Sequence, residues 1–173
     1  MNTRLRKLLL GDQPYIPLRS KYKRIVLTSQ LSIITIVITA IFFVLDSALP
    51  DSLYSLPFLL INGTSAIISL FLNRIGKHTA AKILLALSVN FSIFLFSERE
   101  PLEIGLYLFF LVTNVVTIAA FGYEDKYLAI GFISLPVILF SISLLPDLTF
   151  LPKVTGTPDY NTLNLFCNFS LYF

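Results

Sequence analysis

The sequence predicts an all-α protein: a polytopic transmembrane helix bundle with five complete helices and a truncated sixth. Hydrophobic residues make up 55% of the 173 residues and charged residues only 13%, and the mean hydropathy is +0.80. A soluble domain would contain about twice that share of charged residues. Apolar runs recur at lengths close to the roughly 20 residues that cross a bilayer core. These runs are separated by turns that are rich in proline and charged residues.

The N-terminal segment, residues 1–24, is predicted to be a basic cytoplasmic tail because it holds seven of the thirteen Lys and Arg residues. It either contains a short interfacial helix at residues 5–10 or is disordered. The apolar run 25–45 follows. This run is longer than the apolar region of a signal peptide, and no Ala-x-Ala cleavage site follows it. We therefore expect the run to be retained as the first transmembrane helix.

The predicted membrane domain extends from residue 25 to residue 173. We expect its further complete helices at residues 53–72, 79–97, 102–121 and 128–145. Pro101 is expected to open the fourth helix, and Pro136 is expected to kink the fifth. The last apolar run, 161–173, would span only about 20 Å as a helix. We expect it to be a truncated sixth helix in a fragment of a longer protein, or a helix that enters the bilayer only part-way.

The distribution of basic residues predicts how the chain crosses the membrane. Eleven Lys and Arg residues fall on the side of the N-terminus, against Arg99 and Lys153 on the other side. The positive-inside rule therefore places the N-terminus in the cytoplasm. The lipid bilayer is the expected partner. Nucleic acid is not expected, because the net charge of +3 follows the membrane topology.

An acidic turn at the predicted outer mouth is the first candidate ligand-sensing region. It contains Glu98, Arg99, Glu100 and Glu103. Carboxylates gathered at such a mouth could bind a cation through oxygen ligands, but no EF-hand spacing supports this and no metal site is predicted. The alternative is solvated loop charge in which Arg99 pairs with a neighbouring carboxylate.

Polar residues inside the apolar runs form a second group of candidates. Asn90 and Asn114 are further ligand-sensing candidates. Asn62, Ser65 and Ser69, together with Pro136 in the fifth helix, are expected to contribute to helix packing. Polar side chains in transmembrane helices face the bundle interior and form hydrogen bonds across helices. Ser65 and Ser69 also match the small-xxx-small spacing of close helix contacts. Packing contacts and a ligand pocket remain alternative explanations for the group.

No catalytic site and no cofactor are predicted. His78 is the only histidine, which excludes a triad or a multi-histidine metal site within one chain, and we expect it to be a solvated member of a basic turn. Lys82 is expected to extend to the lipid headgroups. The single cysteine, Cys167, cannot form an internal disulfide. We do not expect this chain to be an enzyme.

Several short motifs resemble a known family. They are Asn73-Arg74-Ile75-Gly76-Lys77, Ala81-Lys82-Ile83-Leu84-Leu85, Asn90, Ile93-Phe94-Leu95-Phe96-Ser97, Glu100-Pro101, Glu103-Ile104-Gly105, Leu108-Phe109-Phe110, Phe121-Gly122-Tyr123-Glu124-Asp125 and Leu148-Thr149-Phe150-Leu151-Pro152. With them the chain resembles the N-terminal multi-helix membrane region of bacterial sensor proteins. The cytosolic part of those sensors is a histidine kinase or, in relatives, a class III nucleotide cyclase.

The resemblance covers roughly residues 20–173. It implies a six-helix sensory module in the bacterial cytoplasmic (inner) membrane, usually a homodimer, that passes a signal to a cytosolic output domain. No kinase or cyclase residue is present to carry over. Two other classes remain open: a stand-alone integral membrane protein, such as a subunit of a complex, and a small transporter. Ion-coupled transport is disfavoured because the only charged residues within the predicted complete helices are Lys82 and Glu103, each near a helix end.

Overall fold

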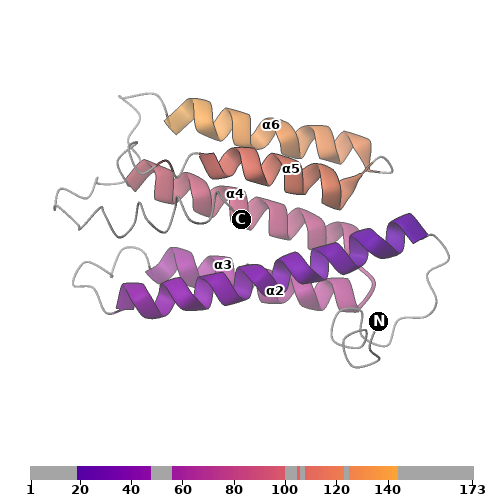
Figure 1. The fold of residues 1–173 in the computed structure, drawn as a ribbon, viewed down its shortest axis with the longest axis horizontal. Helices are drawn as coiled ribbons and strands as arrows, with labels where there is room; N and C mark the ends of the chain where they lie inside the picture. Colours follow the sequence, from indigo (N-terminus) through magenta and orange to yellow (C-terminus); the bar gives the residue numbers. More distant parts are fainter. Residues whose placement is uncertain (1–18, 48–55, 100–104, 106–107, 123–124, 144–173) are drawn as a thin grey trace.

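The computed structural model describes residues 19–47, 56–99, 105, 108–122 and 125–143. This part of the chain is helical and contains no strand (Figure 1). Its helices are α2 (Arg19–Ser47), α3 (Leu56–Arg74), α4 (His78–Arg99), α5 (Phe109–Phe121) and α6 (Lys126–Ser143). The prediction of an all-helical chain is therefore confirmed for the described residues.

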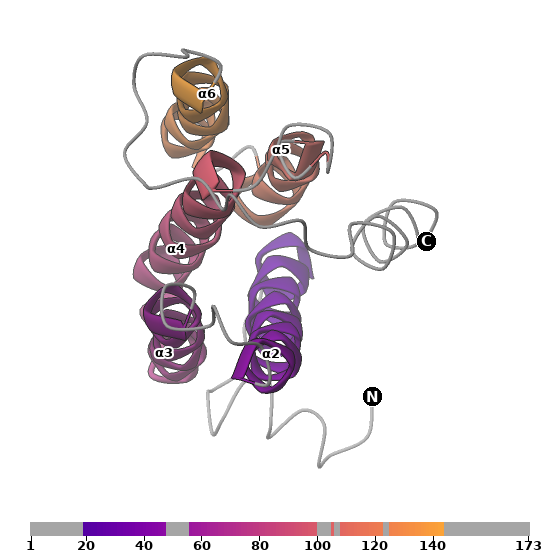
Figure 2. The same ribbon diagram turned by 90° about the vertical axis from the view of Figure 1, so that its left-hand side faces the viewer.

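The helices run up and down and form two layers. α3, α4 and α6 lie in one layer, and α2 and α5 lie in the other (Figure 2). α4 is central, since it contacts all four other helices. α2, α4 and α6 begin at the end of the bundle where α3 and α5 finish (Figure 1). We call this the basic end, because the described residues there include Lys21, Lys23, Arg24, Arg74, Lys77, Lys82 and Lys126.

Two helices differ from their predicted bounds. α2 begins at Arg19, inside the segment predicted to be a tail. α5 begins at Phe109 and not at residue 102. Gly105 has a φ of +76°, in the left-handed region, and the Leu108 N–H donates to the Gly105 carbonyl at 2.9 Å. A turn therefore precedes α5. The predicted sixth helix, 161–173, lies outside the described residues.

The burial pattern is that of a membrane protein. Most of the buried side chains among the described residues are polar, including Ser29, Ser32, Ser69 and Asn73, whereas many large apolar side chains are exposed. Lipid tails can cover such an exterior, while polar groups must find partners inside the bundle. Lys21–Leu45, Leu56–Arg74 and His78–Glu98 are long and apolar enough to cross a membrane. α5 and the Lys126–Ile142 part of α6 are apolar but shorter.

Close packing joins the helices in pairs. At Gly63 of α3, a Cβ atom would lie 3.2 Å from Cγ2 of Thr39 in α2, so glycine permits this approach. The α5–α6 hairpin has its own aromatic contacts. Phe110 and Phe140 meet edge to face with ring centroids 6.5 Å apart, and Phe121 and Phe132 stack at 5.2 Å. α6 continues through Pro136, which is fully buried.

Candidate functional site: a polar cluster at the basic end

The basic end contains a cluster of polar and charged side chains that links all five helices. We call it the basic-end cluster. It consists of Arg24 and Ser29 of α2, Asn73 of α3, His78 and Lys82 of α4, and Asp125 in the turn before α6. Ser29 and Asn73 have no exposed surface and Lys82 is also buried, so their polar atoms depend on partners inside the protein.

Asn73 is the hydrogen-bonding centre of α2, α3 and α4. Its amide nitrogen donates to the Ile25 carbonyl at 2.8 Å and to the Ser29 hydroxyl at 2.7 Å. Its Oδ1 lies 2.7 Å from Nδ1 of His78. Since a carboxamide oxygen can only accept, Nδ1 carries the proton in this contact. One side chain therefore ties the end of α3 to the starts of both α2 and α4.

Serine hydroxyls continue this connection towards the membrane centre. Ser69 of α3 donates to the Ala81 carbonyl of α4 at 2.8 Å, and its hydroxyl lies 3.2 Å from that of Ser32 in α2. Ser32 also donates to the Thr28 carbonyl at 3.0 Å. These groups are buried, and interhelical bonds of this kind contribute about 0.5–2 kcal/mol each inside a membrane. The α2, α3 and α4 helices thus form one cross-linked unit, which we call the α2–α4 unit.

An ion pair attaches the α5–α6 hairpin to this unit. Nζ of Lys82 lies 3.1 Å from Oδ2 of Asp125, and the two side chains are 7% and 27% exposed. The same ammonium group lies 5.7 Å from the ring centroid of Phe121, at the end of α5. Cations are attracted to the faces of aromatic rings. Lys82 therefore holds both the last residue of α5 and the turn that precedes α6.

A second cation reaches the same turn from α2. Nη1 of Arg24 donates to the Phe121 carbonyl at 3.4 Å, where the negative end of the α5 helix dipole favours positive charge. The next residue, Gly122, has a φ of +61°, and a Cβ atom there would overlap the Arg24 guanidinium group. Glycine is thus required both for the backbone conformation and for the approach of Arg24.

The geometry gives the two parts of the bundle different attachments. The α2–α4 unit is joined by hydrogen bonds between buried neutral groups, whereas Arg24 and Lys82 hold the α5–α6 hairpin at its turn. Displacing that turn would separate Lys82 from Asp125 and leave a buried ammonium group without its carboxylate, which is strongly unfavourable. The contacts of Lys82 and Arg24 therefore favour the position of the turn that the structure shows.

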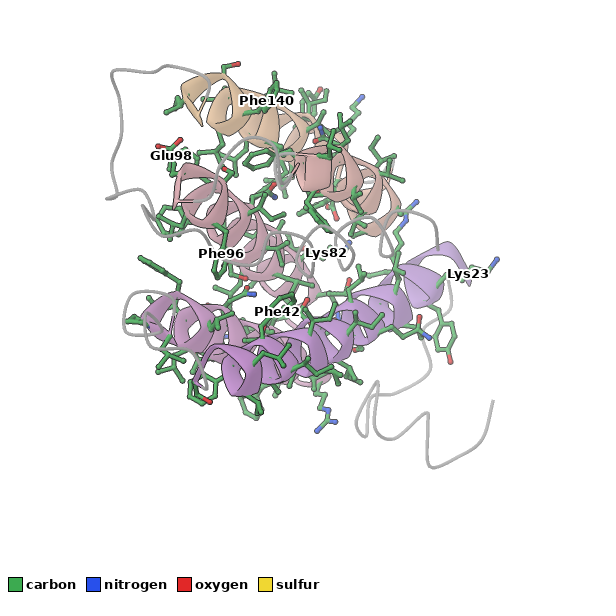
Figure 3. The ribbon with its side chains drawn as sticks, turned by 60° about the vertical axis from the view of Figure 1, so that its left-hand side comes forward. Lys23, Phe42, Lys82, Phe96, Glu98 and Phe140 are labelled. Carbon is green, nitrogen blue, oxygen red and sulfur yellow. The ribbon has the colours of Figure 1, made fainter. Side chains whose placement is uncertain are left out.

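The predicted acidic sensing residues lie at the other end of α4. Figure 3 shows Lys82 and Glu98 towards opposite ends of that helix. Glu98 is only 6% exposed, so solvated loop charge is the wrong description of this residue. Arg99 is the last residue of α4, and its side chain lies outside what the structure describes, as do Glu100 and Glu103.

Asn90 and Asn114, the predicted sensing residues near helix centres, have different environments. Asn90 is buried, and its Oδ1 accepts from the Thr113 hydroxyl of α5 at 2.9 Å while its amide donates to the Ala86 carbonyl. The Oδ1 atom of Asn114 is also buried but has no hydrogen-bond partner among the described residues. Asn90 therefore bridges α4 and α5 near the middle of α4, and the Oδ1 atom of Asn114 accepts no hydrogen bond from the described residues.

The predicted packing residues lie along α3 and α6. Asn62 donates to the Thr39 hydroxyl of α2 at 3.3 Å, although its own Oδ1 is buried without a partner in the described part of the chain. Ser69 bonds to two helices, as given above, and Ser65 is half-buried. Pro136 is buried within α6.

Sequence reasoning missed most of the basic-end cluster. Lys82 is buried and pairs with Asp125, a partner that the sequence prediction for this lysine did not include. His78 is half-buried and bonded to Asn73 and is therefore not simply solvated. The sequence did contain a signal for the partner of Lys82. A lysine inside a membrane helix requires a partner, and Asp125 lies in a turn at the same end of the bundle. Nothing in the sequence indicated that Asn73 faces Ile25 and Ser29.

The described residues contain no group of three or more His, Cys, Asp or Glu side chains that could hold a metal ion. Comparison of the chain with protein-family models, with curated proteins and with solved structures finds no match. Its function must therefore be argued from the cluster itself.

Proposed function

We propose that this chain is the membrane-embedded signal-transducing module of a longer bacterial protein, with the basic end on the cytoplasmic side of the inner membrane. In this proposal the full-length protein is a homodimer whose cytosolic part is a histidine kinase or a nucleotide cyclase. The observation that carries it is the attachment of the α5–α6 hairpin by Lys82 and Arg24 at the basic end. The charge distribution and the family resemblance also support it.

The mechanism is a shift of the hairpin against the α2–α4 unit. A stimulus in the bilayer or at the Glu98 end of α4 moves α5 and α6, and their common turn either keeps or loses its contacts with Lys82 and Arg24. A ligand can bias such an equilibrium only if it binds the two positions with different affinity. The buried charge pair makes intermediate positions unfavourable, so the shift behaves as a switch.

The first test is the gene beyond the Phe173 codon. An in-frame kinase or cyclase coding region supports the proposal, and a stop codon that ends the natural gene there contradicts it and favours a stand-alone subunit.

The second test uses the full-length protein in membranes. Lys82→Asp and Asp125→Lys should each change autophosphorylation or cyclisation several-fold, and combining them should restore the wild-type level because the pair is rebuilt with its charges exchanged. Lys23→Gln is the matched control, since this exposed lysine points away from the bundle (Figure 3). Equal output from all four variants would show that the pair has no part in signalling.

Glu98→Gln tests where the stimulus arrives. This substitution keeps the shape of a buried side chain at the far end of α4 and removes its charge. We expect it to alter the response of the full-length protein to changing conditions while leaving the Lys82–Asp125 pair intact. An unchanged response across pH and salt would remove Glu98 from the sensing path.

A small transporter is the second candidate, and one observation favours it. The Lys82–Asp125 pair at the basic end and the Asn90–Thr113 pair further along α4 place polar groups at two levels between α4 and the α5–α6 hairpin. Proton relays use charged and polar groups inside bundles in this way. Proteoliposomes containing a pH-sensitive dye would test it: proton flux abolished by Asp125→Asn favours the transporter, and an absence of flux favours the signalling module.

A further inference from the structure

Two lysines of the basic end, Lys21 and Lys77, are exposed and bring positive charge to the surface of the described part of the protein. Among the side chains that the structure describes there, Asp125 is the only carboxylate, and it is paired with Lys82. Lys77 precedes His78 in the turn between α3 and α4, and Lys21 lies one helical turn before Ile25, whose carbonyl accepts from the same Asn73 side chain that bonds to His78. An anion is therefore the complementary partner for this surface.

The environment of His78 makes one place on this surface distinctive. Both amide hydrogens of Asn73 are donated to α2, so its oxygen must accept from Nδ1 of the imidazole. In the neutral ring this leaves a lone pair on Nε2, for which the described residues provide no hydrogen-bond partner. Lys21 and Lys77 bring positive charge to this side of the bundle. A phosphate oxygen beside Nε2 would offset that charge and favour an N–H donor there.

The position of His78 indicates the source of the phosphate. His78 begins a helix that is long and apolar enough to cross a membrane, and Lys21 begins such a segment within α2. The turn between α3 and α4 also exposes the large apolar side chain of Ile75. Basic groups at helix ends, next to apolar surface, lie at the level of phospholipid headgroups, where anionic lipids concentrate.

We propose that Lys21, Lys77 and His78 form a binding site for the phosphate of an anionic phospholipid at the basic end of the bundle. Lys21 and Lys77 supply charge, and Nε2 of His78, held in orientation by Asn73, donates the directional hydrogen bond. The site requires only that the protein lies in a membrane. It can therefore be tested separately from the proposed output.

The single histidine provides a direct readout. The full chain, purified with a histidine-free tag and labelled with ring-15N histidine, is placed in phosphatidylcholine nanodiscs with or without phosphatidylglycerol. We expect the Nε2 signal at near-neutral pH to move towards that of a protonated nitrogen when phosphatidylglycerol is present, with the Nδ1 signal unchanged. An Nε2 signal that is the same with and without phosphatidylglycerol would overturn the proposal.

Two substitutions separate a defined site from diffuse attraction. Lys21→Gln and Lys23→Gln remove the same charge from the same turn of α2, but only Lys21 acts on His78. We expect Lys21→Gln to reduce phosphatidylglycerol retention about five-fold, which corresponds to about 1 kcal/mol for one lysine at a membrane surface, and Lys23→Gln to leave the histidine response intact. Equal effects of both substitutions would indicate diffuse attraction and contradict the site.

Inorganic phosphate added to phosphatidylcholine nanodiscs identifies the source of the anion. No change in the Nε2 signal is expected, because free phosphate lacks the acyl chains that concentrate a headgroup at this level. A change equal to that caused by phosphatidylglycerol would assign the site to a soluble anion and overturn the lipid proposal. Circular dichroism of every variant confirms that the helices are retained.

Discussion

The α2–α4 unit and the α5–α6 hairpin are held by different chemistry. Asn73, Ser69 and Ser32 connect the first three helices through buried hydrogen bonds between neutral groups. The hairpin depends on its own aromatic contacts, on the Asn90–Thr113 bond and on two cations at its turn. Neutral bonds are insensitive to nearby charge, whereas an ion pair responds to it. The comparison indicates a stable platform and an adjustable hairpin.

Asn73→Leu should have the largest effect on stability. It removes three contacts of one buried side chain, each contributing about 1 kcal/mol, so we expect a loss of about 3 kcal/mol in the free energy of unfolding measured in bicelles. Amide hydrogen exchange should rise mainly in α2, α3 and α4. Asn62→Leu, on the same helix, removes one longer bond and should cost less than about 1 kcal/mol. Equal losses from the two substitutions would contradict the central role of Asn73.

Asp125→Asn should have the second-largest effect, a loss of about 2 kcal/mol in the free energy of unfolding. Breaking a fully buried pair costs about 3–5 kcal/mol, and the partial exposure of Asp125 reduces this cost. The location of the destabilisation is the important result. Amide hydrogen exchange should rise in α5 and α6, while the amides of α2 and α3 stay protected. If exchange rises equally through the whole bundle, the division into platform and hairpin is wrong.

Thr113→Val tests the connection near mid-membrane. It replaces the hydroxyl that donates to Asn90 with a methyl group of similar size, and we expect a loss of about 1 kcal/mol. Because Asn90 also bonds to its own helix at Ala86, the effect should stay local to α4 and α5. A loss as large as that of Asn73→Leu would make this bond a principal attachment of the hairpin.

Asn114→Leu should have the smallest effect and the opposite sign. The buried oxygen of Asn114 has no hydrogen-bond partner among the described residues, and an unpaired polar group is better replaced by an apolar one. We expect the free energy of unfolding to stay level or to rise by about 0.5 kcal/mol. Destabilisation above about 1 kcal/mol would show that Asn114 has a partner in the membrane-embedded protein.

The comparison also explains which features could be predicted from sequence. Apolar runs indicated α3, α4, α6 and the end of α2 within a few residues, because the length of a membrane helix is a local property. The start of α5 was predicted too early, because the left-handed backbone at Gly105 is not visible in an apolar pattern.

The basic-end cluster could not be predicted from sequence patterns for another reason. Lys82 and Asp125 are 43 positions apart in the sequence. Asn73 donates a hydrogen bond to Ile25, which is 48 positions away. Side chains so distant in sequence come together only through helix packing, and residue type does not reveal which partner is chosen. For the same reason the burial of Glu98, at the edge of a charged turn, was not predicted.

The length of α5 has a consequence for the surrounding lipid. Its 13 residues cover about 20 Å, whereas the 25 residues of the apolar segment of α2 cover about 37 Å. Acyl chains beside α5 therefore meet a shorter apolar wall than those beside α2. Hydrophobic mismatch of this kind carries an energy that changes with bilayer thickness. We therefore expect a thicker bilayer to raise this energy at α5 and to lower it at the longer α2, so that the two parts of the bundle respond to acyl-chain length in opposite directions.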